Sequence, residues 1–252
     1  MNFYIVSLLD AMAEQNINIF CNLNFVKSSA LFSDLRELSM RLKGVTDFYF
    51  GFLKKLEFLP YGAFTRDYFG HYDFLNINGY DRPINEVIHK FSQKKAVFND
   101  VTPVHVRFSD IENMHLVVGL SRIENINNGF LHIVDLCLPK KEIRNISPTV
   151  NYVKEILDCY VPSDKQTLQG FIEAKGFNYS HFQRDCKMCF GDSFYSFWLK
   201  GRMMEAVKDI IFTPLSLKEI AFKNRFLDYQ NMYKAFTRHG VVLKTIPRLA
   251  KL

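Results

Sequence analysis

Apolar positions recur with a helical period through the last third of the chain, from residue 165 onward. Gly176, Gly191 and Pro214 interrupt this pattern. Side chains that cap helix amino termini precede the apolar runs, at Thr167, Asn178, Ser193 and Ser216. The pattern predicts two short helices around a tight turn at 175–178, a long helix from Ser193 to about Ile211, and a second helix pair around a turn at 225–228.

The first 160 residues mix helical and strand patterns. A helical period covers Leu31–Leu56, and the first fifteen residues predict a helix or a strand. The other predicted elements are two strands within Phe58–Phe74, a short helix over Pro83–Phe91, and a hairpin of His115–Leu120 with Phe130–Leu138 around a turn at 125–129. This alternation favours an α/β sensory-type domain, with a sheet covered by helices.

A polar, turn-rich stretch at 139–148 separates the two patterns. The following segment, Thr149–Tyr160, has the apolar spacing of an amphipathic helix, and residues 161–164 then break the chain. We therefore expect an α/β sensory or dimerisation domain at 1–162, with 149–160 as connector helix. An all-α domain with two helix-turn-helix motifs joined by a long helix is expected at 163–252.

Charge is distributed unevenly between these two parts. The chain of 252 residues has a net charge of +6, but residues 165–252 hold 15 Lys/Arg against 7 Asp/Glu, and the rest holds 17 against 19. A basic module attached to a near-neutral one is typical of a nucleic-acid binder with a regulatory or assembly domain. A basic face that is merely solvated is the alternative.

Composition and motifs exclude several functional classes. No apolar run is long enough for a membrane span, and the first residues lack the basic start of a signal peptide, so we expect a cytoplasmic protein without a membrane partner. The five cysteines suit reduced thiols, and Cys186-x-x-Cys189 is best interpreted as two core residues. Scattered histidines and the absence of catalytic motifs predict no enzyme, no metal and no cofactor.

Three stretches of the carboxy-terminal third form one further pattern: GFNYSHFQRDCKMCFG at 176–191, FWLKGRMMEA at 197–206 and LSLKEIAFKNRFLDYQNMYKAF at 215–236. Arg202 and Ala206 form a basic-and-small pair, sixteen positions run from Ala206 to Ala221, and Phe226 and Phe236 are aromatic anchors. These features resemble the DNA-binding domain of the AraC/XylS transcriptional regulators, in which a central helix joins two helix-turn-helix units.

The second helix of each unit is expected in a major groove. On 179–189 the predicted inward row is Phe182, Cys186 and Cys189 or Phe190, and the outward row is Ser180, Gln183, Arg184 and Lys187. Gln can pair with adenine and Arg with guanine. The resemblance implies base reading by Ser180, Gln183, Arg184, Tyr229, Gln230, Tyr233 and Lys234. A polar residue on a solvated face is the alternative for each.

Other cations are expected on the phosphates, which give affinity without sequence information. They are Lys187, Lys200, Lys208, Lys223, Arg238 and Lys244. Arg202 has two interpretations, a DNA contact or a structural contact with an acidic partner. The chain departs from the family at Arg225, where Gly is usual, at Cys186, where Phe is usual, and in the closing element after Gly240.

Leu56–Gly62, followed by Val87, Phe91 and Asp100, is similar to the layout of LuxR-type autoinducer-binding domains, and the 130–138 hairpin also fits PAS or GAF-like sensors. That resemblance implies a small-molecule effector site at Tyr61, Phe91 and Asp100. An aromatic-rich core without a pocket is the alternative.

These observations predict a sequence-specific transcriptional regulator that binds double-stranded DNA, acts as a homodimer and engages RNA polymerase. Its amino-terminal domain either senses a small molecule or mediates dimerisation. The alternative function is a protein-interaction or antiactivator module that keeps the helical fold without reading DNA.

Overall fold

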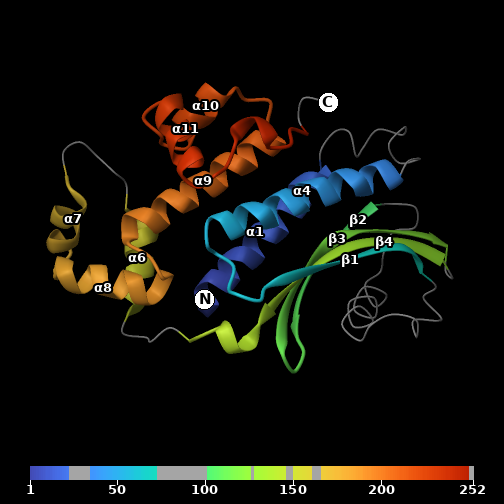
Figure 1. Ribbon diagram of the computed structural model, residues 1–252, viewed down its shortest axis with the longest axis horizontal. Coiled ribbons are helices and arrows are strands. Elements are labelled where there is room, and N and C mark those ends of the chain that lie inside the picture. Colours follow the sequence, from blue (N-terminus) through green and yellow to red (C-terminus); the bar gives the residue numbers. More distant parts are fainter. Residues whose placement is uncertain (23–34, 73–100, 126–127, 146–149, 161–165, 250–252) are drawn as a thin grey trace.

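The computed structural model describes residues 1–22, 35–72, 101–125, 128–145, 150–160 and 166–249. Within these residues the fold is mixed α/β, with a four-stranded antiparallel sheet and eight α-helices (Figure 1). No helix in this part of the chain is long and apolar enough to cross a membrane.

The sheet is built from β1 (Phe64–Tyr72), β2 (Val101–Ser109), β3 (Asn113–Asn125) and β4 (Asn128–Pro139), in the order β1-β4-β3-β2. The predicted hairpin of β3 with β4 is confirmed. Within the described residues 58–72 the prediction of two strands is wrong, because β1 is the one strand that forms there. Left-handed backbone at Glu57 (φ 59°) and Gly62 (φ 84°) makes the preceding stretch a turn, which cannot pair in a sheet.

Two long helices cover one face of the sheet (Figure 1). Helix α1 (Phe3–Asn22) packs on β2 and β3, and α4 (Leu35–Lys55) lies beside α1 and approaches β4. The helical period predicted over 31–56 is thus confirmed for α4, which runs uninterrupted through Gly44 and Gly51. The helix predicted over 83–91 lies outside the described residues.

The helices after the sheet agree closely with the sequence pattern. They are α6 (Asn151–Cys159), α7 (Leu168–Ala174), α8 (Tyr179–Phe190), α9 (Phe194–Phe212), α10 (Leu217–Lys223) and α11 (Tyr229–Arg238). All four predicted caps are confirmed, since the side chains of Thr167, Asn178, Ser193 and Ser216 each accept a backbone N–H of the first turn. Gly191 ends α8 in the left-handed conformation, φ 73°, which glycine adopts at no steric cost.

The hydrophobic core is one cluster that crosses the predicted boundary near residue 162. The ring of Phe58 meets Phe197 of α9 edge-on, with centroids 5.5 Å apart, and Tyr4 of α1 lies 5.8 Å from Phe190 of α8. Asn2 donates a hydrogen bond to the carbonyl of Cys189. The amino-terminal helices are therefore packed directly against the carboxy-terminal ones.

Candidate nucleic-acid interface

Helix α9 connects two pairs of short helices (Figure 1). Helices α7 and α8 are joined by a turn at 175–178, and α7 packs on α8, which packs near the beginning of α9. Helices α10 and α11 pack over the later half of α9. The turn between α10 and α11 contains Arg225 with φ 57°. This left-handed backbone costs free energy when the residue has a side chain and little when it is glycine.

Helix α8 has one buried row and one exposed row. Phe182, Cys186, Cys189 and Phe190 are buried, as predicted. Phe190 stacks on Phe197 of α9 with ring centroids 4.0 Å apart, which holds α8 against the connecting helix. The opposite row therefore faces away from α9.

The exposed row of α8 contains Ser180, Arg184 and Lys187. Gln183 is only half exposed, and its Nε2 donates a hydrogen bond to the Tyr179 hydroxyl at 2.9 Å. The side chain of Arg184 is 68% exposed, with Nε 3.7 Å from a carboxylate oxygen of Asp185. Asp185 is itself held by the Tyr152 hydroxyl at 2.7 Å, so Arg184 keeps the freedom to reach a ligand.

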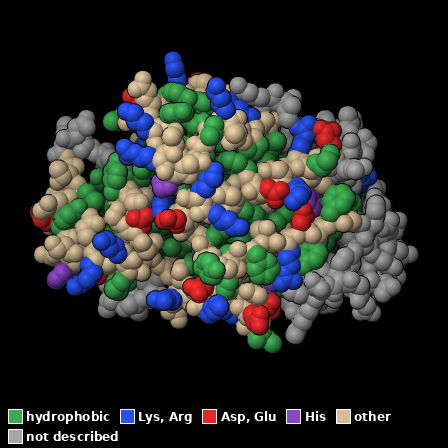
Figure 2. Space-filling view, in the orientation of Figure 1, with side chains coloured by type: hydrophobic (Ala, Val, Ile, Leu, Met, Phe, Trp, Pro, Cys, Tyr) green, Lys and Arg blue, Asp and Glu red, His purple; other side chains and the backbone are tan. Residues whose placement is uncertain are grey.

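Helix α11 repeats this arrangement at the other end of α9. Met232, Ala235 and Phe236 are buried, whereas Gln230, Tyr233, Lys234 and Arg238 are exposed and Tyr229 is half-buried. The Asp228 side chain caps the helix by accepting the backbone N–H of Asn231 at 2.7 Å. Lys and Arg side chains gather around α10 and α11 at the top of Figure 2, while acidic side chains lie mainly lower.

Three of the six cations predicted to contact phosphates are already engaged within the protein. Lys200 is buried, with Nζ 2.8 Å from Asp192 Oδ2 and 3.8 Å from Glu57 Oε2, so the prediction for Lys200 is wrong. Lys208 is largely buried and pairs with Glu205. Lys223 Nζ lies 2.6 Å from Oδ1 of the buried Asp209.

The remaining three, Lys187, Arg238 and Lys244, are exposed and make no ion pair within the part of the chain that the structure describes. They are the predicted phosphate ligands that have both the exposure and the free charge for this role. Lys187 lies on α8, Arg238 lies at the end of α11, and Lys244 follows α11. Each helix pair therefore carries at least one of these cations on it or next to it.

The Lys200–Asp192 pair fixes the start of α9. Burial by itself raises the pKa of Asp192, but hydrogen bonds from Lys200 and from the Ser196 hydroxyl outweigh it and hold the pKa below its usual range. Asp192 is thus ionised in the folded protein and holds the lysine in place. Sequence reasoning missed this pair because a lysine that becomes buried has the same local pattern as an exposed one.

Arg202 is structural, but its partner is not the expected carboxylate. Its guanidinium lies between the rings of Trp198 and Phe226, 4.3 Å and 4.2 Å from their centroids, and Nε donates to the carbonyl of Asn224 at 2.8 Å. Burial in this sandwich lowers the pKa of Arg202 to about 10. Arg202 joins α9 to the segment between α10 and α11.

Of the three residues predicted to form the effector site, the structure describes Tyr61. Tyr61 is 95% exposed and cannot line a pocket, so the prediction for Tyr61 is wrong, while Phe91 and Asp100 lie outside the described residues. Tyr61 follows the turn at Glu57 and precedes β1, which leaves its side chain in solvent. No local pattern in the sequence distinguishes this exposed tyrosine from a buried one.

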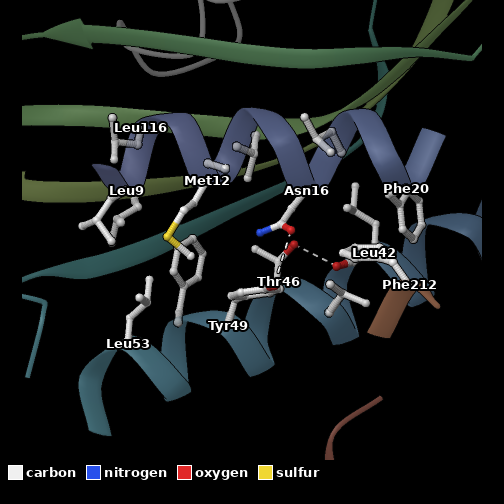
Figure 3. A pocket seen from close by; sticks show the side chains of 16 residues that line it. Leu9, Met12, Asn16, Phe20, Leu42, Thr46, Tyr49, Leu53, Leu116 and Phe212 are labelled. Atoms are coloured by element: carbon white, nitrogen blue, oxygen red, sulfur yellow. Dashed lines mark hydrogen bonds between the residues drawn. The ribbon is translucent and has the colours of Figure 1, made fainter. Parts of the chain in front are cut away.

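A cavity of about 70 Å³ lies elsewhere, between α1, α4 and the sheet (Figure 3). Its lining is apolar except for Asn16, Thr46 and Tyr49, and it contains no charged side chain. The Tyr49 hydroxyl donates to Asn16 Oδ1 at 3.3 Å, and the Thr46 hydroxyl donates to the Leu42 carbonyl at 2.8 Å. Phe212, at the end of α9, contributes to the wall, so the cavity touches both parts of the chain.

No family model, curated protein or solved structure matches the chain. The resemblance to AraC/XylS regulators therefore rests on the residues quoted above.

Proposed function

We propose that the protein is a sequence-specific DNA-binding transcriptional regulator in which α7–α8 and α10–α11 act as two helix-turn-helix units. One observation carries the proposal: α8 and α11, the second helices of the two pairs, both bury an apolar row against the rest of the helical part and expose a polar, cation-bearing row. That division is what a helix needs to enter a major groove while it stays attached to its domain.

The exposed side chains have suitable chemistry for such a groove. Arg184 can form two hydrogen bonds with guanine, and Gln183 and Gln230 can pair with adenine. Lys187, Arg238 and Lys244 supply charge for the phosphates, which sets affinity and its salt dependence. A location in the cytoplasm, a homodimeric assembly and contact with RNA polymerase accompany this proposal as expectations.

The amino-terminal part is assigned a regulatory role, through an effector or through dimerisation. The cavity between α1 and α4 supports the effector, because Phe212 of α9 forms part of its wall. A molecule that binds one arrangement of α1, α4 and α9 more tightly than a second arrangement would shift the protein toward the first. The size of the shift is set by the difference between the two affinities. The absence of charged lining residues favours a small uncharged molecule.

The decisive experiment uses the full-length chain, because its core is continuous from α1 to α11. Duplexes selected from random and genomic DNA are titrated at several salt concentrations and followed by fluorescence anisotropy. The Arg184→Ala/Lys187→Ala variant should lose specific binding, and Lys141→Ala, which removes an exposed cation far from α8 and α11 in the sequence, should not. A folded wild-type protein without DNA binding at low salt would refute the function.

A protein-interaction module is the second candidate, and it is favoured by the surface of the second helix pair. Phe222 is 82% exposed and Leu227 is 87% exposed, on either side of the turn at Arg225. Exposed patches of large apolar side chains mark protein–protein contact sites. Under this alternative, Phe222→Ser/Leu227→Ser abolishes partner capture and leaves any DNA affinity unchanged.

A further inference from the structure

Three metal-ligating side chains meet on the sheet, on the face opposite α1 and α4. His115 of β3 is the direct cross-strand partner of Cys137 of β4, and Asp135 lies two residues before Cys137. Leu116 and Leu136 point to the helix-covered core, so strand alternation places His115, Asp135 and Cys137 on the other face. All three side chains are buried.

Their ligand atoms lie at the separations of a metal coordination shell. His115 Nδ1 is 3.0 Å from both Asp135 carboxylate oxygens and 3.6 Å from Cys137 Sγ, and Sγ is 3.4 Å from Asp135 Oδ2. A tetrahedral Zn²⁺ ion, with bonds of about 2.0–2.3 Å to nitrogen, oxygen and sulfur, separates such atoms by roughly 3.3–3.6 Å. The side chains therefore need to move by only a few tenths of an ångström to hold an ion.

The outer partners orient the imidazole for this role. Asp110 Oδ2 lies 2.8 Å from His115 Nε2, the nitrogen that faces away from Cys137. Asp110 is held in turn by the backbone N–H groups of Glu112 and Asn113, at 2.8 Å and 2.6 Å. A carboxylate on the second ring nitrogen is the usual support of a histidine that binds a metal, because it fixes the ring and raises its basicity.

We propose that His115, Asp135 and Cys137 bind a divalent transition-metal ion, Zn²⁺ in the first instance, as three buried protein ligands. A mixed set of imidazole, thiolate and carboxylate donors suits Zn²⁺ better than the oxygen-preferring Mg²⁺ and Ca²⁺. The ion joins the paired strands β3 and β4 and stabilises the sheet on which α1 packs. The proposal is independent of DNA binding.

The competing state is a metal-free cluster held by hydrogen bonds. Burial lowers the pKa of His115, but the hydrogen bonds to Asp135, Cys137 and Asp110 outweigh it and raise the pKa to about 10. In that state the ring is protonated on both nitrogens, and Cys137 is a thiol. Binding must displace the Nδ1 proton and the thiol proton, which both leave to solvent as the metal bonds form.

The test uses full-length protein that has been freed of metal with a chelator. On titration with Co²⁺, the wild type should show thiolate-to-cobalt charge-transfer absorption and the strong bands of four-coordinate cobalt. Zn²⁺ should then displace the cobalt at one ion per chain and raise the melting temperature. Cys137→Ser should lose the charge-transfer band, whereas two matched controls should keep it: Cys159→Ser, which changes an exposed thiol, and His132→Gln, which changes a buried histidine bonded to Asp67.

Asp110→Asn provides a second variant in case Cys137→Ser does not fold, because the Asp110 side chain is partly exposed and not itself a ligand. It should weaken Zn²⁺ binding by about 10- to 100-fold. The proposal is overturned if the wild type shows no charge-transfer band with Co²⁺, or if Cys137→Ser or Asp110→Asn binds metal as tightly as the wild type.

Discussion

The ring of Phe52 on α4 stacks on the ring of Phe236 on α11, with centroids 6.0 Å apart and planes 7° from parallel. Both side chains are fully buried. One belongs to the helix layer over the sheet and the other to the second proposed DNA-reading helix. The stack therefore joins α4 to α11 through direct side-chain contact.

Removing one ring of this pair should destabilise the whole protein. Phe52→Ala is expected to lower the free energy of unfolding by about 3–5 kcal/mol, because it leaves a cavity at the junction of the two parts. Urea unfolding followed by circular dichroism measures the change. Phe3→Ala, at an exposed position on α1, serves as the control and should change the free energy by less than about 0.5 kcal/mol. Equal losses in both variants would contradict the assigned packing.

The exposed row of α8 should divide into residues that set specificity and residues that set affinity. Arg184→Ala should cost about 1–3 kcal/mol on the preferred duplex and relax the preference at one base pair. Lys187→Ala should weaken binding to all duplexes alike and reduce the slope of affinity against salt. Selection from a random library, repeated with Gln183→Ala/Arg184→Ala, checks the assignment. An unchanged preferred sequence would remove α8 as the reading helix.

The Lys200–Asp192 pair predicts loss of stability in acid. The folded-state pKa of Asp192 lies below its usual value, so its contribution is present above the unfolded pKa of about 3.9 and is lost as the pH falls through the folded value. In Asp192→Asn, the free energy of unfolding should therefore fall less between neutral pH and about pH 3 than it does in the wild type. Asp47 forms an exposed pair with Lys43, so Asp47→Asn should leave this pH dependence of the unfolding free energy unchanged. Urea midpoints measured across this range decide between the two outcomes.

Arg225→Gly should stabilise the protein, although it removes a side chain. The residue has φ 57°, a conformation that costs about 1 kcal/mol or more with a side chain and little with glycine. We expect a gain of about 0.5–1 kcal/mol after the entropy of glycine in the unfolded chain is included. Arg184→Gly, within the regular helix α8, should instead lose about 1 kcal/mol. A destabilised Arg225→Gly variant would mean that the arginine side chain has a structural contact worth more than the relief of strain.

The cavity between α1 and α4 should accept a small uncharged aromatic probe such as indole. Met12, which lines it, is flexible and can move to enlarge the space. The probe should raise the melting temperature of the wild type, with a stabilisation of about 2.7 kcal/mol when its free concentration is 100 times its Kd. Ala13→Leu fills the cavity and should abolish the effect. A similar rise in both proteins would place the probe elsewhere.

Local signals in the sequence were sufficient for the helices after residue 150. Each capping side chain and the buried row of α8 depend on neighbours within one helix, which periodicity and residue type report. The burial of Lys200 and the exposure of Tyr61 could not be predicted in this way. Both depend on tertiary structure, namely the turn at Glu57 and the packing of Phe58 on Phe197. The His115, Asp135 and Cys137 cluster has no sequence spacing typical of metal sites, since its members are brought together across two strands.

Helix α9 runs through Gly201 without a break and extends from Phe194 to Phe212. At about 1.5 Å per residue this rigid rod is about 28 Å long, close to the roughly 34 Å of one B-DNA turn. Under the proposed function, α9 fixes the distance between the two reading helices, so that both face the same side of the duplex. An operator whose two subsites are moved apart by about half a helical turn, or about 5 base pairs, would then present its second subsite on the opposite side of the DNA, where α11 cannot follow.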